Sequence, residues 1–206
     1  MDRCGTGPAV HGAFSQLGVV QPIVLGHSWG TLVALELALR ASAAVQKLVL
    51  VSGYYFPTAR VDVALAAPPA IPLIGDILRY TVSPLAARLM LNKTVKGMFA
   101  PQPVPPEFLP ALSREMLVRP MQIRANAEDA AFMIPAAAGL QNRYVEVTAP
   151  AVIFAGEADP VVDPDAHARK LHTQLSNSAL QMLPGVGHMA HHAAPGEIVA
   201  AISSKI

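Results

Sequence analysis

The chain has 206 residues, of which 52% are hydrophobic, 14% charged and 5% aromatic. Such a composition excludes an intrinsically disordered protein, and the length suits one sizeable core with an added lobe better than two full domains. Fifteen basic and fourteen acidic side chains give a formal net charge of +1, so we expect no nucleic-acid partner. A single cysteine, Cys4, cannot form an intramolecular disulfide, and without clustered thiols we expect no metal site and no cofactor.

The sequence predicts no membrane span. The most apolar stretch, residues 63–74, contains three prolines, which would break a spanning helix. A second apolar stretch, residues 30–55, is interrupted by three charged side chains, and the amino terminus lacks the continuous apolar run of a signal peptide. We therefore expect a soluble protein in a reducing, cytoplasmic location.

The first third of the chain predicts a strand, a helix and a second strand in succession. Residues 22–27 and 47–52 are short apolar runs rich in branched side chains, which is typical of buried strands. Between them, residues 31–42 place leucines and alanines on one helical face and charged residues elsewhere. Short joints of this kind imply parallel strands with a right-handed crossover.

The last part of the chain continues this alternation. Residues 151–155 predict a third strand, 165–175 a helix, 179–183 a fourth strand and 195–206 a final helix. Both ends of the chain are therefore expected to form one doubly wound, mostly parallel α/β sheet.

The middle of the chain has a different composition. Thirteen of the nineteen prolines lie between Tyr54 and Pro150, and the pattern there favours short helices at 74–80, 84–91, 106–118 and 121–140. We interpret the chain as three parts: the first part of the core at 1–53, an inserted helical lid at 54–148, and the second part of the core at 149–206.

Two apolar groups of this middle part have open interpretations. Tyr54, Tyr55 and Phe56 leave the second strand toward the lobe, where they either line a substrate entrance or pack as an apolar hinge. Five methionines make either an adaptable pocket wall or ordinary core filling, and the second is favoured: Met90, Met98, Met116, Met121 and Met133.

Gly26-His27-Ser28-Trp29-Gly30 lies between the first predicted strand and the first helix. At such a junction the pattern G-x-S-x-G makes a sharp turn, and glycine on both sides leaves room for the close approach of the backbone. Ser28 is then lifted clear at the carboxyl end of the sheet, beside the positive end of the helix dipole. We expect Ser28 to be a nucleophile and the Trp29 N–H to be an oxyanion donor.

A serine hydroxyl needs a base, and an imidazole base needs a third group that fixes its tautomer. Asp159 follows the third predicted strand in Gly156-Glu157-Ala158-Asp159-Pro160, and His188 follows the fourth in Gly185-Val186-Gly187-His188. Both therefore lie at the same edge of the sheet as Ser28. The order Ser, Asp, His is the one that accompanies this elbow.

The chain resembles the α/β-hydrolase fold family over nearly its whole length. GHSWG, GEADPVVD and LPGVGHMAHH are similar to the family's elbow, acid and histidine motifs in order and spacing. The resemblance implies that Ser28 is the nucleophile, Asp159 the orienting acid and His188 the general base. It further implies a lidded esterase or perhydrolase-like branch, because the related epoxide hydrolases and haloalkane dehalogenases have aspartate at the elbow.

Each of these assignments has a competitor. Asp163 or Asp165 could replace Asp159, but they lie further along the loop and are better placed to cap the following helix. His188, His191 and His192 could form a metal cluster, but no carboxylate or thiol stands at ligand spacing. His27 is expected to pack beneath the elbow, because its neighbour Ser28 points the opposite way.

The amino terminus departs from the family pattern, which has several strands before the elbow. The pair His11-Gly12 resembles an oxyanion loop, but it lies too close to the elbow, and residues 13–18 are better explained by a helix that ends at Gly18. Residues 2–7 resemble the family's D-R-x-G-x-G loop. We therefore hypothesise a chain shortened at its amino terminus, with an unprotected sheet edge at residues 22–27 that predicts a homodimer or poor solubility.

The leading expectation from sequence is a serine hydrolase that cleaves small to medium apolar carboxylic esters through an acyl-enzyme. Acyl transfer and perhydrolysis differ only in the nucleophile that resolves the acyl-enzyme. The loss of one oxyanion donor typically lowers the rate about 10²–10³-fold, so shortening would impair the activity. The alternative is a catalytically weak or silent remnant that acts as a binding protein.

Overall fold

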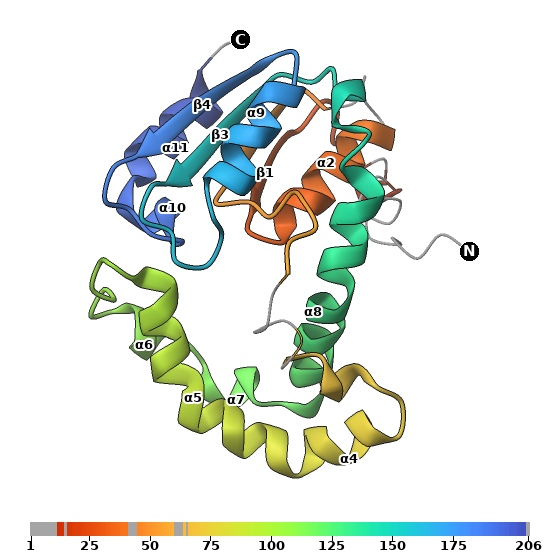
Figure 1. The fold of residues 1–206 in the computed structure, drawn as a ribbon, viewed down its shortest axis with the longest axis vertical. Helices are drawn as coiled ribbons and strands as arrows, with labels where there is room; N and C mark the ends of the chain where they lie inside the picture. The colour runs from red at the N-terminus through yellow and green to blue at the C-terminus, as the bar shows by residue number, and fades with distance from the viewer. Residues whose placement is uncertain (1–11, 15, 41–44, 60–63, 65, 205–206) are drawn as a thin grey trace.

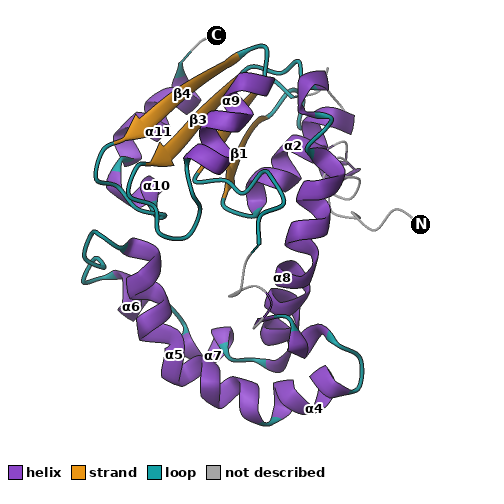
Figure 2. Cartoon of the chain, in the orientation of Figure 1, coloured by secondary structure: helices purple, strands orange, loops and turns teal. Residues whose placement is uncertain are grey.

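A computed structural model describes residues 12–14, 16–40, 45–59, 64 and 66–204 of the chain. Its centre is a four-stranded parallel sheet in the order β1-β2-β3-β4. The strands are β1 (Ile23–His27), β2 (Lys47–Val51), β3 (Ala151–Gly156) and β4 (Ser178–Leu183). Helices cover both faces of this sheet (Figures 1 and 2), so the predicted doubly wound α/β class is confirmed.

The alternation of side chains along β2 and β3 divides the core into two layers. Leu48, Leu50 and Ile153 pack in the larger apolar cluster with helix α2 (Gly30–Arg40). Val49 and Phe154 point to the other face, where they pack against helix α11 (Pro195–Ser203). All five residues of β2 are buried, as expected of a central strand in a sheet that is covered on both faces.

The buried lysine at the start of β2 fastens α11 to the sheet. Lys47 Nζ donates to the carbonyl oxygens of Ala201 at 2.9 Å and Ser204 at 2.6 Å, and it lies 3.1 Å from Ser204 Oγ. An ammonium group suits the end of a helix, where carbonyl oxygens lack intrahelical partners and the dipole is negative. The final helix stops at Ser203, before the predicted end at 206, which is outside the described residues.

Between β3 and β4 the chain makes a π-helical turn at Asp165–Arg169 and continues as α9 (Lys170–Gln174). A short helix α10 (Ala190–Ala193) precedes α11. The predicted helix at 165–175 therefore exists, with a wider first turn than the sequence pattern shows.

The segment between β2 and β3 forms a helical lobe, which curves away from the sheet in Figure 1. Its helices are η2 (Pro68–Ala70), α4 (Ile74–Tyr80), α5 (Val82–Phe99), α6 (Phe108–Ala111), α7 (Arg114–Leu117), α8 (Pro120–Leu140) and η3 (Tyr144–Glu146). Among the described residues of this segment there is no strand, as predicted.

Two predicted lobe helices have different extents. The helix expected at 84–91 extends to Phe99, because no proline occurs between Pro84 and Pro101 and the burial of Val95 and Phe99 stabilises its last turns. The helix expected at 106–118 is divided into α6 and α7, because Ser113 takes an extended conformation and its side chain accepts from the Met116 N–H to begin a new helix.

Tyr54, Tyr55 and Phe56 are buried in the larger core cluster. The Tyr144 hydroxyl donates to the Tyr55 carbonyl at 2.6 Å, and the Tyr55 N–H donates to His167 Nδ1 at 3.0 Å. Burial raises the pKa of both Tyr55 and Tyr144. The hinge interpretation is therefore correct, and these rings line no entrance.

The methionines of the lobe do not fill its core as a group. Met90, Met116 and Met121 are 58%, 55% and 70% exposed, so the favoured interpretation of core filling is wrong for these three. Helical spacing could not reveal this, because it does not show whether a second surface covers the apolar face. Only Met98 and Met133 pack against buried clusters.

At the other side of the sheet, β1 is the edge strand, and Leu25 on it is 45% exposed. Leu17 N–H donates to the Ala13 carbonyl, Val19 N–H donates to the Phe14 carbonyl, and Gly18 has a φ of +65°, which is the predicted helix end. His11 and residues 2–7 lie outside the described residues.

Across the described ranges, no helix is both long and apolar enough to cross a membrane.

Candidate active site

The elbow is built where β1 ends at His27 and α2 begins at Gly30. Ser28 has a φ of +53°, a left-handed conformation that costs free energy for any residue with a Cβ. Hydrogen bonds hold it there: Ser28 N–H donates to the Val51 carbonyl at 3.0 Å, and Thr31 Oγ1 donates to the Ser28 carbonyl at 2.6 Å. The strain aims a single hydroxyl away from the sheet.

The two glycines of the elbow differ in their steric role. A Cβ on Gly26 would lie 2.7 Å from the Gly30 carbonyl oxygen and 2.8 Å from Thr31 Cα, so this position requires glycine. A Cβ on Gly30 would meet no atom within 4 Å. The expectation that both glycines make room is therefore wrong for Gly30, because a side chain there would point into open space.

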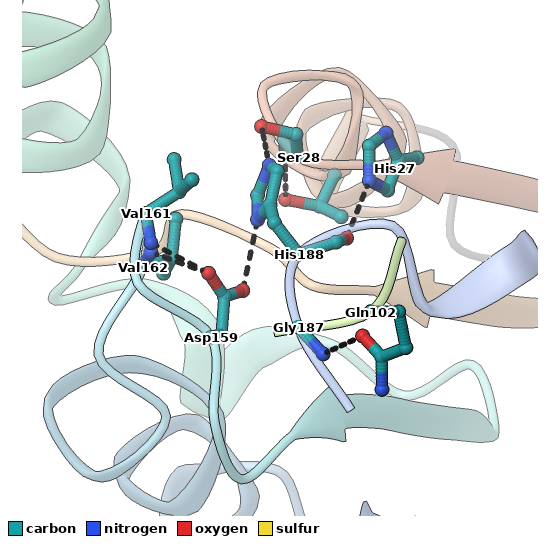
Figure 3. Close-up of polar contacts among 9 residues, drawn as sticks. His27, Ser28, Gln102, Asp159, Val161, Val162, Gly187 and His188 are labelled. Atoms are coloured by element: carbon teal, nitrogen blue, oxygen red, sulfur yellow. Dashed lines mark hydrogen bonds and ion pairs between the residues drawn. The ribbon is translucent and has the colours of Figure 1, made fainter. Parts of the chain in front are cut away.

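The structure brings Ser28, Asp159 and His188 together (Figure 3). His188 Nε2 lies 3.0 Å from Ser28 Oγ, and His188 Nδ1 lies 2.8 Å from Asp159 Oδ2. Because a carboxylate only accepts, Nδ1 carries the proton of the neutral ring, and Nε2 presents a lone pair to the serine hydroxyl. The side chains of His188 and Asp159 are each only 2% exposed, which strengthens the interaction between them.

The acid loop orients its own carboxylate. Asp159 Oδ1 accepts from the backbone N–H groups of Val161 at 2.8 Å and Val162 at 2.9 Å, so only Oδ2 is directed at the histidine. Asp163 Oδ1 accepts from the N–H groups of Asp165 at 2.8 Å and Ala166 at 3.1 Å.

Asp163 therefore caps the first N–H groups of the helical turn that begins at Asp165, the role predicted for it from the sequence. Asp165 pairs with Arg169 at 2.7 Å. Neither of these rivals contacts His188.

His27 lies under the histidine loop. Its Nε2 is 3.1 Å from the His188 carbonyl oxygen, and because a carbonyl only accepts, this nitrogen is the donor. Its ring also contacts the His188 ring at a tilt and the His191 ring edge-on, with centroids 5.0 Å and 4.4 Å away. Burial lowers the pKa of His27 to about 4, so the ring is neutral near pH 7.

The other histidines extend this row of rings toward the lobe. Burial lowers the pKa of His191 as well, and the His192 ring packs against Phe99 and Phe108 with centroids 5.2 Å and 5.3 Å away. Within the described ranges, no three His, Cys, Asp or Glu side chains are placed to hold a metal ion.

Trp29 follows Ser28 directly and precedes the first residue of α2. Backbone N–H groups at this end of a helix have no intrahelical acceptor, and the dipole there is positive. The predicted oxyanion role thus has a suitable location, while the Trp29 ring packs against the larger core cluster.

Sequence reasoning missed one polar residue at the site, Gln102 of the lobe. Its side chain contacts the loop that carries His188, where Gly187 N–H donates to Gln102 Oε1 at 3.0 Å. Nothing in the proline-rich sequence around Gln102 indicates this contact, because the two residues are 85 positions apart in the chain.

Comparison with known proteins agrees with this fold. A family model described as "Serine aminopeptidase, S33" matches residues 13–194. An α/β-hydrolase fold protein from Burkholderia ambifaria is 21% identical, with a TM-score of 0.77 over 97% of this chain and 71% of that one.

An α/β hydrolase enzyme from a Medee basin deep-sea metagenome library is 17% identical over 97% of this chain and 72% of that one, with a TM-score of 0.70. An esterase from Exiguobacterium antarcticum is 19% identical over 96% of this chain and 72% of the esterase, with a TM-score of 0.64. A search of curated protein sequences found no match.

Proposed function

We propose that this chain, which belongs to the α/β-hydrolase family described as "Serine aminopeptidase, S33", hydrolyses small to medium apolar carboxylic esters through an acyl-enzyme on Ser28. The observation that carries the proposal is the continuous line of contacts from Ser28 Oγ through His188 to Asp159, at 3.0 Å and 2.8 Å.

In the first half-reaction, Ser28 Oγ attacks the ester carbonyl while His188 Nε2 takes the hydroxyl proton. Asp159 stabilises the imidazolium that forms and keeps its orientation. The tetrahedral intermediate then collapses, and His188 returns the proton to the departing alcohol. In the second half-reaction His188 deprotonates a water molecule, which attacks the acyl-enzyme and releases the acid.

The negative charge on the carbonyl oxygen needs donors that are already in place. The Trp29 N–H is our candidate, because it follows the nucleophile in the chain and lies at the positive end of α2. Donors of this kind act without reorganisation at the moment of reaction.

We assign the lobe at 54–148 the role of a lid that excludes water and selects the acyl or alcohol group. Support comes from its position after β2, next to the strand that leads into the elbow. The lobe residues that pack beside the histidine loop, Val95 and Phe99, are apolar, which favours an apolar substrate over a charged one.

A series of p-nitrophenyl esters with acyl chains of two, four and eight carbons tests this function. The wild type should hydrolyse them, and Ser28→Ala should lower kcat by about 10⁴-fold or more while the thermal unfolding midpoint stays the same. The control Ser176→Ala changes an exposed serine between α9 and β4 and should leave the rates unchanged.

Amino-acid p-nitroanilides form a second arm, because the family description names an aminopeptidase. Faster cleavage of the anilides than of the esters would replace the ester proposal with a peptidase one. A folded wild type that turns over neither substrate would favour the binding-protein alternative.

A further inference from the structure

The loop that carries His188 is held by hydrogen bonds to five backbone groups between the Gly185 carbonyl and the His188 carbonyl. Val186 N–H donates to the Leu183 carbonyl at 3.3 Å, and the Val186 carbonyl accepts from Ala158 N–H at 3.0 Å. The His188 carbonyl accepts from His27. These three contacts come from the core of the molecule.

The two remaining contacts come from one lobe side chain. Gln102 Nε2 donates to the Gly185 carbonyl at 2.6 Å, and Gln102 Oε1 accepts from the Gly187 N–H at 3.0 Å. The amide thus uses both its donor and its acceptor on backbone groups on either side of Val186, as a neighbouring strand would. Figure 3 shows the second of these contacts, from the Gly187 N–H to Gln102. Gly187 is buried and directly precedes His188.

The backbone of the lobe touches the same point of the loop. A Cβ on Gly187 would overlap the carbonyl oxygen of Ala100, whereas a Cβ on Gly185 would meet nothing within 4 Å. Gly185 has a φ of +68° and is required by the turn itself. Glycine at 187 is instead required by the approach of the lobe.

Apolar contacts continue this attachment on the far side of His188. Met189, 8% exposed, lies in a small buried cluster whose other two buried members, Val95 and Phe99, belong to α5 of the lobe. The His192 ring packs against Phe99 as well. The lobe therefore contacts the chain immediately before and immediately after His188.

We propose that Gln102 is a positioning residue that couples the lobe to the catalytic geometry, by fixing the loop that aims His188 at Ser28. This inference rests on the proposed function, since it assigns His188 the part of general base. The Gln102 side chain contacts the backbone of the loop and not the side chains of Ser28 or His188, so it acts through the Gly187 peptide.

Small displacements of the loop that carries His188 are expected to lower the catalytic rate. Without Gln102, one side of the loop keeps only its apolar contacts, and the Gly187 N–H loses its acceptor at a buried site. A displacement of about 1 Å in a catalytic group can cost about 100-fold in rate. Water can replace part of the lost bonding, so we expect a fall of about tenfold to 100-fold.

The test measures kcat and KM for p-nitrophenyl acetate, with rates divided by the concentration of active sites titrated with a fluorophosphonate. Gln102→Met keeps the length of the side chain and removes both hydrogen bonds. Gln102→Glu keeps the acceptor for Gly187 N–H and removes the donor to the Gly185 carbonyl. The matched control is Gln122→Met, on α8, where Gln122 Nε2 donates to Asn126 at 2.9 Å.

The proposal predicts that Gln102→Met lowers kcat and the second-order labelling rate of Ser28 by about tenfold or more, with KM within twofold of the wild type. The kcat and labelling rate of Gln102→Glu should lie between those of Gln102→Met and the wild type. Those of Gln122→Met should equal the wild-type values. A residue with only a structural role would lower the unfolding midpoint and the titrated fraction, but it would leave kcat per active site unchanged.

Wild-type kcat and labelling rates in Gln102→Met would overturn the inference, and so would equal losses in Gln102→Met and Gln122→Met. If Gln102→Met does not fold, the comparison of Gln102→Glu with the wild type decides the question in the same way. The proposed function fails separately, in a wild-type protein that neither labels nor turns over ester.

Discussion

The sheet and the helical lobe bury their apolar side chains in different ways. Every residue of β2 is buried, and the two faces of the sheet pack against helices within the core. In the lobe, α5 has 18 residues but buries only Val95 and Phe99. Exposed large apolar residues on the lobe helices include Ile77, Leu85 and Leu89, at 67%, 62% and 76%.

Two groups of lobe residues, far apart in the sequence, therefore attach the lobe to the core. In the first group, Ala137 and Leu140 of α8 pack in the larger core cluster. In the second, Phe99 at the end of α5 packs with Met189 of the histidine loop. The core is stabilised by its own packing, whereas the position of the lobe depends on contacts with the core. One of these two attachments lies beside the proposed general base.

The largest expected effect is on kcat, from a substitution at the catalytic edge of the core. Asp159→Asn should lower kcat about 10⁴-fold, because its amide would still accept from the Val161 and Val162 N–H groups but would present a donor to His188 Nδ1 and favour the wrong tautomer. Asp163→Asn is the matched control on the same loop and should retain activity within about threefold, since its side chain caps a helix. Equal losses in both variants, measured with p-nitrophenyl acetate, would contradict the assignment of the acid.

In stability, the largest effect should come from the core. Ile153→Ala in β3 removes a fully buried side chain and should lower the free energy of unfolding by about 2–5 kcal/mol, measured by urea denaturation. A cost below about 1 kcal/mol would mean that the sheet is not the stable region of the molecule.

The stability of the protein is expected to depend on pH through His27, the residue before the nucleophile. The pKa of His27 is about 4 in the folded protein and near 6.5 when the residue is exposed, so the unfolded chain binds an extra proton between these values. Stability therefore rises with pH across this window and is lost as the pH falls through it, by about 3 kcal/mol from this residue.

His27→Gln keeps a donor for the His188 carbonyl without a titrating ring. It should flatten the pH dependence of the urea midpoint between pH 4 and pH 6.5. An unchanged pH dependence in this variant would show that burial of His27 does not cause it.

The smallest effect is expected on the exposed face of the lobe. Leu89→Ser in α5 should change the free energy of unfolding by no more than about 0.5 kcal/mol, because the side chain is 76% exposed. A loss near that of Ile153→Ala would mean that this face is covered in solution, and sedimentation of the wild type would then show whether a second copy covers it.

The sequence predicted the core and the three proposed catalytic residues because their signals are local. Each strand is a short apolar run, and Ser28, Asp159 and His188 each lie in the loop or turn that follows the carboxyl end of a parallel strand, so the topology brings them to one edge. The contact between Gln102 and Gly187 has no such signal, because it joins two loops through one side chain. The exposure of Met90 and Met121 was also beyond reach, since periodicity shows that a face is apolar but not whether another surface covers it.

The central claim, that Ser28 is a nucleophile activated by His188, is tested most directly by covalent labelling. The wild type is incubated with a fluorophosphonate, and peptide mapping locates the adduct. We predict a single adduct on Ser28, which is absent from Ser28→Ala and forms far more slowly in His188→Ala. A folded wild type that remains unmodified, or one that is modified to the same extent after Ser28→Ala, would contradict the claim.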